Sequence, residues 1–317
     1  HTRGIVLEFT DENEVTALSA GSTSDANSGL SPFFHRTAPP DKFQLATLAT
    51  AAQNEGVETF GIVVQAGDAY TENLALQLEN AVGDKAVSKI EVQADAANDY
   101  DTLLANLYGP QPDAVLVAVI TESLQLEVLH EINDAVDLPM DKAELRFLMV
   151  DAHRSSTSLL EGGPKALLSG TLADGSRRVL GTIPNPDPES AEFKQFQTQL
   201  SGIGEDTDLS GMSAHNYDMI YVLALAIEAA GRAGADPTDI VAFRKAVNSQ
   251  IREVSRGPGD AVGIADGWAS MKAKAAAADV NYEGVSGPCD INDEGDAKSA
   301  YNVWTISADN AGDLLVE

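Results

Sequence analysis

The sequence is poor in basic residues and in cysteine, and it contains no long apolar run; each shortage excludes a class of function. It has 20 Lys and Arg against 49 Asp and Glu, a formal net charge of −29. This balance excludes a general nucleic-acid binder and docking on anionic lipid, because both require clustered cations. The single cysteine, Cys289, cannot form an internal disulfide or a thiolate metal site. No run approaches the about 18 consecutive apolar residues of a membrane-spanning helix.

Motifs for catalysis and cofactor binding are also missing from the sequence. The five histidines are scattered, with no i, i+4 pair, and there is no G-x-S-x-G elbow or Walker A motif. The glycines at 202 and 204 and at 257 and 259 do not follow a strand in the G-x-G-x-x-G spacing of dinucleotide sites. The sequence therefore predicts no metal, no cofactor and no enzymatic nucleophile, so we expect a binding protein.

A regular alternation of apolar strands and helices is present in the middle of the chain. Hydrophobic residues make up 44% and charged residues 22%, as in a globular protein, and 317 residues suffice for two domains. We predict strands at 60–64, 87–92, 114–120, 145–150 and 167–172. We predict helices at 43–54, 69–81, 98–108 and 121–135. Continuous apolar strands separated by helices indicate an α/β lobe with a parallel sheet.

Helix-rich segments lie on both sides of this lobe. We predict a helix at 2–13, a strand at 15–19, and helices at 188–200, 214–233 and 237–251. The first and the third of these later helices would begin at Asp187-Pro188 and at Asp236-Pro237. These flanks indicate a second lobe built from two separate stretches. The chain would cross between lobes near 36–41, 172–178 and 285–300. The predicted lobes are 1–38 with 175–288, and 39–174 with 289–317.

Residues 290–296, Asp-Ile-Asn-Asp-Glu-Gly-Asp, partly match a calcium-binding EF-hand loop. The twelfth position of such a loop would be Tyr301 in place of the bidentate Glu, and no flanking helices are expected. We therefore interpret the segment as a turn between two strands and predict no calcium site.

Polar residues that follow predicted strands are candidates for a binding site. Gly21, Ser22 and Thr23 follow strand 15–19, where backbone N–H groups and hydroxyls can hold a carboxylate without a cation. Tyr70 and Asp151 follow strands 60–64 and 145–150 at the carboxyl edge, where open α/β folds bind ligands. Asp151 suits an ammonium group. A plain Ser-rich turn and a helix-capping Asp remain the alternatives on spacing alone.

Four segments resemble periplasmic leucine/isoleucine/valine-binding proteins, the type I solute-binding proteins of ABC transporters. The family motifs FFRTAPSD, DxYGxGLA, NAYDAVYLLALAIEAAG and FDENGDxxxAYxVW have counterparts, in this order, at 34–41, 68–75, 215–231 and 290–304. The resemblance implies an α/β fold of the type I periplasmic-binding-protein kind, with two lobes of parallel sheets flanked by helices. It also implies a hinge of three crossings and a ligand enclosed between the lobes on closure.

The resemblance assigns roles to the candidate residues. Residues 19–23 are similar to the family's SPAAT loop, so the Gly21 N–H and the Thr23 hydroxyl would hold the ligand α-carboxylate. Tyr70 matches the aromatic lid, and Asp151, within an offset of one residue, matches the acid that receives the α-ammonium.

Two departures from the family leave the ligand open. Amino-acid binders place an aromatic residue where this chain has Ile120 or Thr121, and small residues are commoner where this chain has His153 and Arg154. These differences put a branched-chain amino acid in doubt and admit a different or acidic ligand.

Family members also begin with strands and helices that precede the segment equivalent to Thr2. We therefore expect a truncated or missing N-terminal segment, which would carry a lipid anchor and a disulfide partner for Cys289 if the protein has them.

Together these features predict a monomeric, periplasmic or extracellular solute-binding subunit of an ABC importer. Its partners would be an amino acid or similar small zwitterion and a membrane permease. The alternative is a sensory or regulatory ligand-binding domain of a receptor on the same fold.

Overall fold

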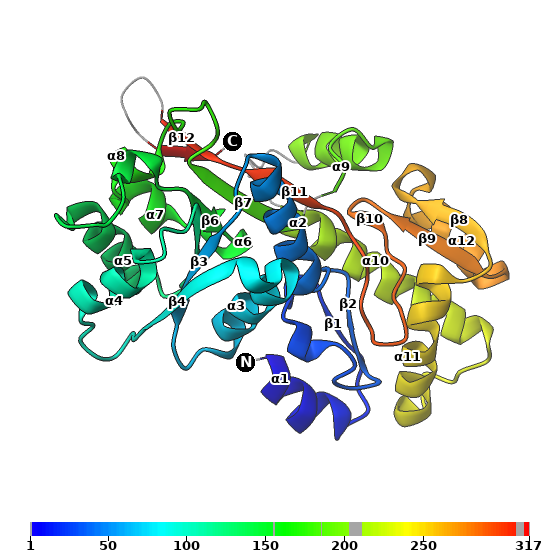
Figure 1. Ribbon diagram of the computed structural model, residues 1–317. Helices are drawn as coiled ribbons and strands as arrows, with labels where there is room; N and C mark the ends of the chain where they lie inside the picture. Colours follow the sequence, from blue (N-terminus) through cyan, green and yellow to red (C-terminus); the bar gives the residue numbers. More distant parts are fainter. Residues whose placement is uncertain (1, 155, 185, 203–210, 309–313, 317) are drawn as a thin grey trace. The chain divides into compact units, whose positions relative to one another are not determined.

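The structure, a computed structural model, describes residues 2–154, 156–184, 186–202, 211–308 and 314–316 (Figure 1). The chain divides into two compact units. Unit 1 comprises His1–Pro40 and Pro184–Tyr301, and unit 2 comprises Asp41–Ile183 and Asn302–Glu317. The chain therefore passes from one unit to the other three times.

Unit 2 is built on a six-stranded sheet with the strand order β11-β7-β6-β5-β3-β4. The strands from β4 to β7 in this order are all parallel to their neighbours. They are β3 (Phe60–Gln65), β4 (Ala86–Val92), β5 (Ala114–Ala118), β6 (Phe147–Met149) and β7 (Val179–Pro184), and β11 (Tyr301–Trp304) lies at the edge. A short antiparallel pair, β12 (Ile306–Ala308) and β13 (Leu314–Val316), follows.

Helices cover both faces of this sheet because its strands are apolar on both sides. Ile62 and Val64 pack in a core with residues of α2 (Asp41–Asn54) and α3 (Ala69–Val82). Val63 packs in the opposite core with residues of α4 (Tyr100–Tyr108) and α5 (Glu122–Asp134). The shorter elements of unit 2 are η3 (Gly83–Lys85), η4 (Lys142–Glu144), α6 (Asp151–Arg154), α7 (Thr157–Gly162) and α8 (Lys165–Leu168).

The winding of the chain reverses between β3 and β5. Strand β3 is continued by α3 on one face, whereas its neighbour β5 is continued by α5 on the other. In open α/β sheets such a switch point leaves a crevice outside the carboxyl ends of the two strands, and ligands bind there. The loops after β3 and β5 are therefore the first place to look for a site in unit 2.

The described part of unit 1 contains two small sheets and the two longest of the described helices, α10 (Gly211–Arg232) and α11 (Ile240–Arg256). Strand β1 (Ala17–Ser19) is parallel to β2 (Phe34–Arg36), and β9 (Val280–Gly284) lies between β8 (Asp260–Gly263) and β10 (Gly287–Pro288). The helices are α1 (Thr2–Ile5), η1 (Val6–Asp11), η2 (Asp25–Asn27), α9 (Ala191–Gly202), α10 (Gly211–Arg232), α11 (Ile240–Arg256), η5 (Ile264–Asp266) and α12 (Trp268–Ala277). The main core of unit 1 joins α10 and α11 to β8 and β9, and it includes the buried Cys289.

The predicted alternation of strands and helices from residue 43 to residue 150 is confirmed, but the strand predicted at 167–172 is wrong. Leu167 and Leu168 belong to α8, and Thr171 forms an isolated bridge with Arg177, whereas the next strand of the sheet is β7. Both leucines are buried in the core. A short apolar run does not distinguish a buried strand from a buried helical turn, which explains the error.

Two predicted helix starts are also wrong by several residues. Helix α9 is capped by Ser190, whose Oγ accepts the Phe193 N–H at 3.2 Å. Helix α11 is capped by Asp239, whose Oδ1 accepts the Ala242 N–H at 3.2 Å. Asp187 and Asp236 instead accept N–H groups two residues on, at 2.9 and 2.8 Å, and so form turns that precede the helices.

Within the part of the chain that the structure describes, no helix is both long enough and apolar enough to cross a membrane.

Candidate ligand-binding residues

Tyr70 and Asp151 meet at the carboxyl edge of the unit 2 sheet. Asp151 begins α6 directly after β6, and its Oδ1 accepts a hydrogen bond of 3.0 Å from the Tyr70 hydroxyl. Tyr70 is placed by Asp68, which caps α3 and accepts the backbone N–H groups of Tyr70 and Thr71. The structure thus brings together the two unit 2 residues that the sequence singles out for an aromatic lid and an ammonium acceptor.

Gln44 is a third member of this group that sequence reasoning missed. Its Nε2 donates to Asp151 Oδ1 at 3.2 Å and to the Thr182 carbonyl oxygen at 3.1 Å. Gln44 lies on the buried face of α2 beside Leu45 and Leu48. A polar residue on an otherwise apolar helix face is the signal that would have identified it.

The environment of Asp151 acts on its ionisation in two opposed ways. Burial raises the pKa of the carboxyl above its ordinary value, while the hydrogen bonds from Gln44 and Tyr70 stabilise the ionised form. The net pKa is raised. A cation next to Asp151 would favour the ionised form, so this carboxylate suits a positively charged group.

Ile120 and Thr121 lie in the loop that follows β5, on the switch-point side of the sheet. Their backbone N–H groups donate to Oε1 of Gln65, the last residue of β3, at 3.3 and 3.0 Å. Gln65 therefore joins the end of β3 to the loop that follows β5. Both Ile120 and Thr121 are partly buried, and neither supplies the aromatic ring that the family's amino-acid binders have here.

His153 is a structural residue of the same edge. Its ring is buried, Nδ1 accepts the Val150 N–H at 3.0 Å, and Nε2 donates to the Val119 carbonyl at 2.8 Å. These two bonds fix the neutral tautomer with its proton on Nε2. Burial lowers the pKa of His153 to about 4. The residue ties the ends of β5 and β6 together, which accounts for its presence where smaller residues are commoner.

The loop of Gly21, Ser22 and Thr23 is held within unit 1. The Ser19 hydroxyl accepts the N–H groups of Gly21 and Ser22 at 3.4 and 3.0 Å. Gly21 is exposed, Ser22 is partly buried and bonds the Thr2 hydroxyl at 2.8 Å, and Thr23 is buried. The structure thus gives this loop a fixed backbone at the end of β1.

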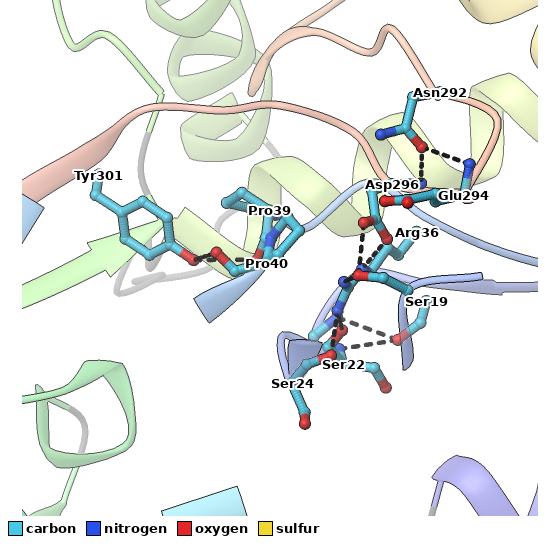
Figure 2. A network of polar contacts seen from close by, with 12 residues as sticks. Ser19, Ser22, Ser24, Arg36, Pro39, Pro40, Asn292, Glu294, Asp296 and Tyr301 are labelled. Carbon is cyan, nitrogen blue, oxygen red and sulfur yellow. Dashed lines mark hydrogen bonds and ion pairs between the residues drawn. The ribbon is translucent and has the colours of Figure 1, made fainter. Parts of the chain in front are cut away.

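The side chain of Arg36 holds the backbone of this loop through hydrogen bonds. Its Nη1 donates to the carbonyl oxygens of Ser22 and Ser24 at 2.6 and 2.9 Å, and its Nε donates to Asp296 Oδ1 at 2.7 Å (Figure 2). The side chains of Arg36 and Asp296 are 0% and 3% exposed. Nη2 also donates to Ser28 Oγ at 2.8 Å. The carboxylate of Asp296 thus balances the charge of the guanidinium inside the unit, while the guanidinium holds four oxygen acceptors in place.

The turn expected at 290–296 is present and is bound to the same arginine. Asn292 Oδ1 accepts the N–H groups of Glu294 and Asp296 at 2.9 and 3.0 Å (Figure 2). In the segment that partly matches a calcium-binding loop, Asn292 thus closes the turn and Asp296 pairs with Arg36. Among the described residues, no three His, Cys, Asp or Glu side chains are grouped in a way that could hold a metal ion.

Tyr301 joins two of the segments at which the chain passes between units. Its hydroxyl donates to the carbonyl oxygens of Pro39 and Pro40 at 3.0 and 3.3 Å (Figure 2). The end of the first stretch of unit 1 is therefore tied to the end of the second.

The parallel sheet of unit 2, covered by helices on both faces, makes this an α/β protein of the type I periplasmic-binding-protein fold. The family model described as the receptor family ligand binding region matches residues 4–309, and the chain belongs to this family. The predicted family and fold class are thereby confirmed. No curated protein sequence matches the chain.

Several solved structures share the fold at low sequence identity. A leucine-binding protein, LivK, from Thermotoga maritima is 18% identical, with a TM-score of 0.67 over 99% of this chain and 75% of that chain. The branched-chain amino acid transporter substrate-binding protein LivJ from Streptococcus pneumoniae, in complex with isoleucine, is 13% identical, with a TM-score of 0.66 over 100% and 75%. A solute-binding protein of an ABC transporter from R. palustris, in complex with 4-hydroxybenzoate, is 12% identical, with a TM-score of 0.66 over 99% and 74%. These likenesses show the fold, and the similar proteins are solute-binding proteins rather than enzymes.

Proposed function

We propose that this protein is the extracytoplasmic solute-binding component of an ABC importer and that it binds an amino acid or a similar small zwitterion without chemical turnover. The observation that carries the proposal is the contact between Tyr70 and Asp151 at the carboxyl edge of the unit 2 sheet. A carboxylate supported by two side-chain donors and flanked by an aromatic ring is suited to an ammonium group.

In this proposal each unit supplies residues for one end of the ligand. On unit 2, Asp151 accepts the ammonium N–H groups and Tyr70 covers the ligand, while Ile120 and Thr121 line the side chain. Residues Gly21, Ser22 and Thr23 of unit 1 bind the carboxylate through backbone N–H groups and hydroxyls. The predicted lobe boundaries belong to the same proposal.

The ligands of the similar proteins point in two directions. Among the similar solved structures, one is a leucine-binding protein and another is in complex with isoleucine, whereas two others are in complex with 4-hydroxybenzoate and with benzoate. Asp151 favours the first group, because a benzoate has no N–H to donate and would bring a second negative charge to a carboxylate.

The partner in this proposal is a membrane permease, and the protein acts as a monomer in the periplasm or outside the cell, held by a lipid anchor if its N-terminal segment carries one. A second candidate is a sensory ligand-binding domain, which the description of the family as a receptor region favours. Permease and ATPase genes beside the gene for this protein would support the importer, whereas an adjoining signalling module would support the receptor.

A thermal-shift screen with amino acids, amides, polyamines and carboxylates tests the proposal. A ligand present at 100 times its Kd stabilises the folded state by about 2.7 kcal/mol, which is readily measured. We expect stabilisation by at least one amino acid. Stabilisation by carboxylates that lack an amine, with none by any amino acid, would contradict the proposal.

A further inference from the structure

Two buried polar atoms close to Asp151 have no hydrogen-bond partner among the described residues. They are Gln44 Oε1 and Thr182 Oγ1. Both side chains are 0% exposed. Buried polar atoms in native proteins are nearly always hydrogen-bonded, so two orphans at one place indicate a partner outside the described residues.

The orientation of the Gln44 amide follows from its two donated hydrogen bonds. Nε2 donates to Asp151 Oδ1 at 3.2 Å and to the Thr182 carbonyl at 3.1 Å. The reverse orientation would place the amide oxygen against two other oxygen acceptors. Oε1 is bonded to the same carbon as Nε2, so it lies within a few ångström of the Asp151 carboxylate and is left as an open acceptor.

Thr182 presents its hydroxyl on the same face of the sheet as Gln44. Leu180, two residues earlier on β7, packs in the core that contains Leu45 and Leu48 of α2. Side chains two residues apart on a strand share a face, so Thr182 also faces α2. The Thr182 carbonyl accepts a hydrogen bond from Gln44, so Thr182 lies beside the first turn of α2.

We propose that Gln44 Oε1 and Thr182 Oγ1 join Asp151 as three acceptors for a primary ammonium group, so that this site selects ligands with an unsubstituted amine. The inference rests on the proposed function and deepens it by specifying the ligand's donor group. A primary ammonium has three N–H donors, a secondary ammonium has two, and a carboxylate has none. N-methylation therefore leaves one of these acceptors buried without a partner, which weakens binding.

Isothermal titration calorimetry with three matched pairs of ligands tests the inference on the unmodified protein. The probes are alanine, leucine and glutamate, each with its N-methyl derivative. For whichever parent binds, we expect the N-methyl derivative to bind at least about tenfold more weakly, as expected for one unpaired polar group. Equal affinity for a parent and its N-methyl derivative would overturn the inference and leave the proposed function standing. Failure of every parent to bind, together with binding of an aromatic acid, would overturn both.

Variants assign the selectivity to the two residues. Thr182→Val removes an oxygen that has no hydrogen-bond partner among the described residues, and Gln44→Met removes the amide at similar volume. Gln53→Met changes an exposed glutamine of the same helix and is the control. We expect both site variants to bind the parent amino acid more weakly than the unmodified protein does. We also expect the ratio of the affinities for the parent and for its N-methyl derivative to become smaller, while Gln53→Met changes neither quantity. Melting curves establish that each variant is folded. An unchanged ratio of the two affinities in Thr182→Val would contradict the assignment of the selectivity to Thr182.

Discussion

Arg36 and Asp296 form a buried ion pair of 2.7 Å that joins residues 260 positions apart in the sequence. The same guanidinium donates to the Ser22 and Ser24 carbonyls, so the pair connects the loop after β1 to the turn at 292–296. The loop proposed to bind the ligand carboxylate therefore depends on a contact made at the opposite end of unit 1's sequence.

Removing one partner of this pair destabilises the protein. Asp296→Asn leaves the arginine buried without its counter-charge, and we expect the free energy of unfolding to fall by about 3–5 kcal/mol. Urea unfolding followed by circular dichroism measures the change. The control is Glu79→Gln, which breaks the exposed pair between Lys89 and Glu79 and should cost less than about 1 kcal/mol. Equal losses of unfolding free energy in the two variants would contradict this prediction, because they would show that the buried pair stabilises the protein no more than the exposed pair does.

Gly295 is required by both its backbone conformation and its surroundings. Its φ is +80°, and a Cβ would lie 2.3 Å from the Phe34 carbonyl oxygen. Gly29 has a similar φ of +65° but open space around its Cα. We expect Gly29→Ala to cost about 1–2 kcal/mol from the left-handed conformation alone, and Gly295→Ala to cost clearly more. Thermal unfolding of both variants checks the ranking, and the reverse order would contradict the packing seen at this turn.

The burial of His153 makes stability depend on pH. Its pKa is about 4 in the folded protein against an ordinary 6.5. Between these values the unfolded chain binds a proton that the folded protein does not, so the free energy of unfolding falls as the pH falls from 6.5 to 4. A shift of this size corresponds to roughly 3 kcal/mol over that interval.

Other buried groups add to this dependence or oppose it. His35 and His215 also have a pKa of about 4 and act in the same direction. Asp151 and Asp218 have raised pKa values and act in the opposite direction, because the folded protein binds their protons more tightly.

His153→Gln isolates the contribution of His153. We expect a shallower loss of stability between pH 6.5 and 4 in urea titrations of this variant. The exposed His130, changed to Gln, provides the comparison for the loss of a histidine elsewhere in the same unit. The same slope in His153→Gln as in the unmodified protein would mean that the imidazole is not held neutral.

The sequence was informative where burial imposes a simple pattern. The strands of unit 2 are apolar on both faces and stand out as continuous runs, and residues that follow such strands share one edge, which is why Tyr70 and Asp151 could be paired in advance. Gln44 could not be found in this way, because it comes from a helix rather than from a strand end.

The remaining differences between the predictions and the structure come from contacts between residues far apart in the sequence and from alternative local conformations of short segments. Nothing near Arg36 in the sequence indicates that its partner is Asp296. The starts of α9 and α11 were misplaced because two residues able to cap a helix precede each of them, Asp187 and Ser190 before α9 and Asp236 and Asp239 before α11. Side-chain geometry decides which of the two caps the helix and which closes a turn. Leu167 and Leu168 were assigned to a strand because a short apolar run in the sequence does not distinguish a buried strand from a buried helical turn.

The most direct test of the account is calorimetric titration of the Asp151→Asn variant with the amino acid that binds the unmodified protein. Asp84→Asn, an exposed change in the same unit, is the control. We predict that Asp151→Asn weakens binding at least about tenfold, because it removes the charge that holds the ammonium group, and that Asp84→Asn leaves binding unchanged. Binding of the amino acid to Asp151→Asn as tightly as to the unmodified protein would contradict the claim that this carboxylate receives the ligand's amine.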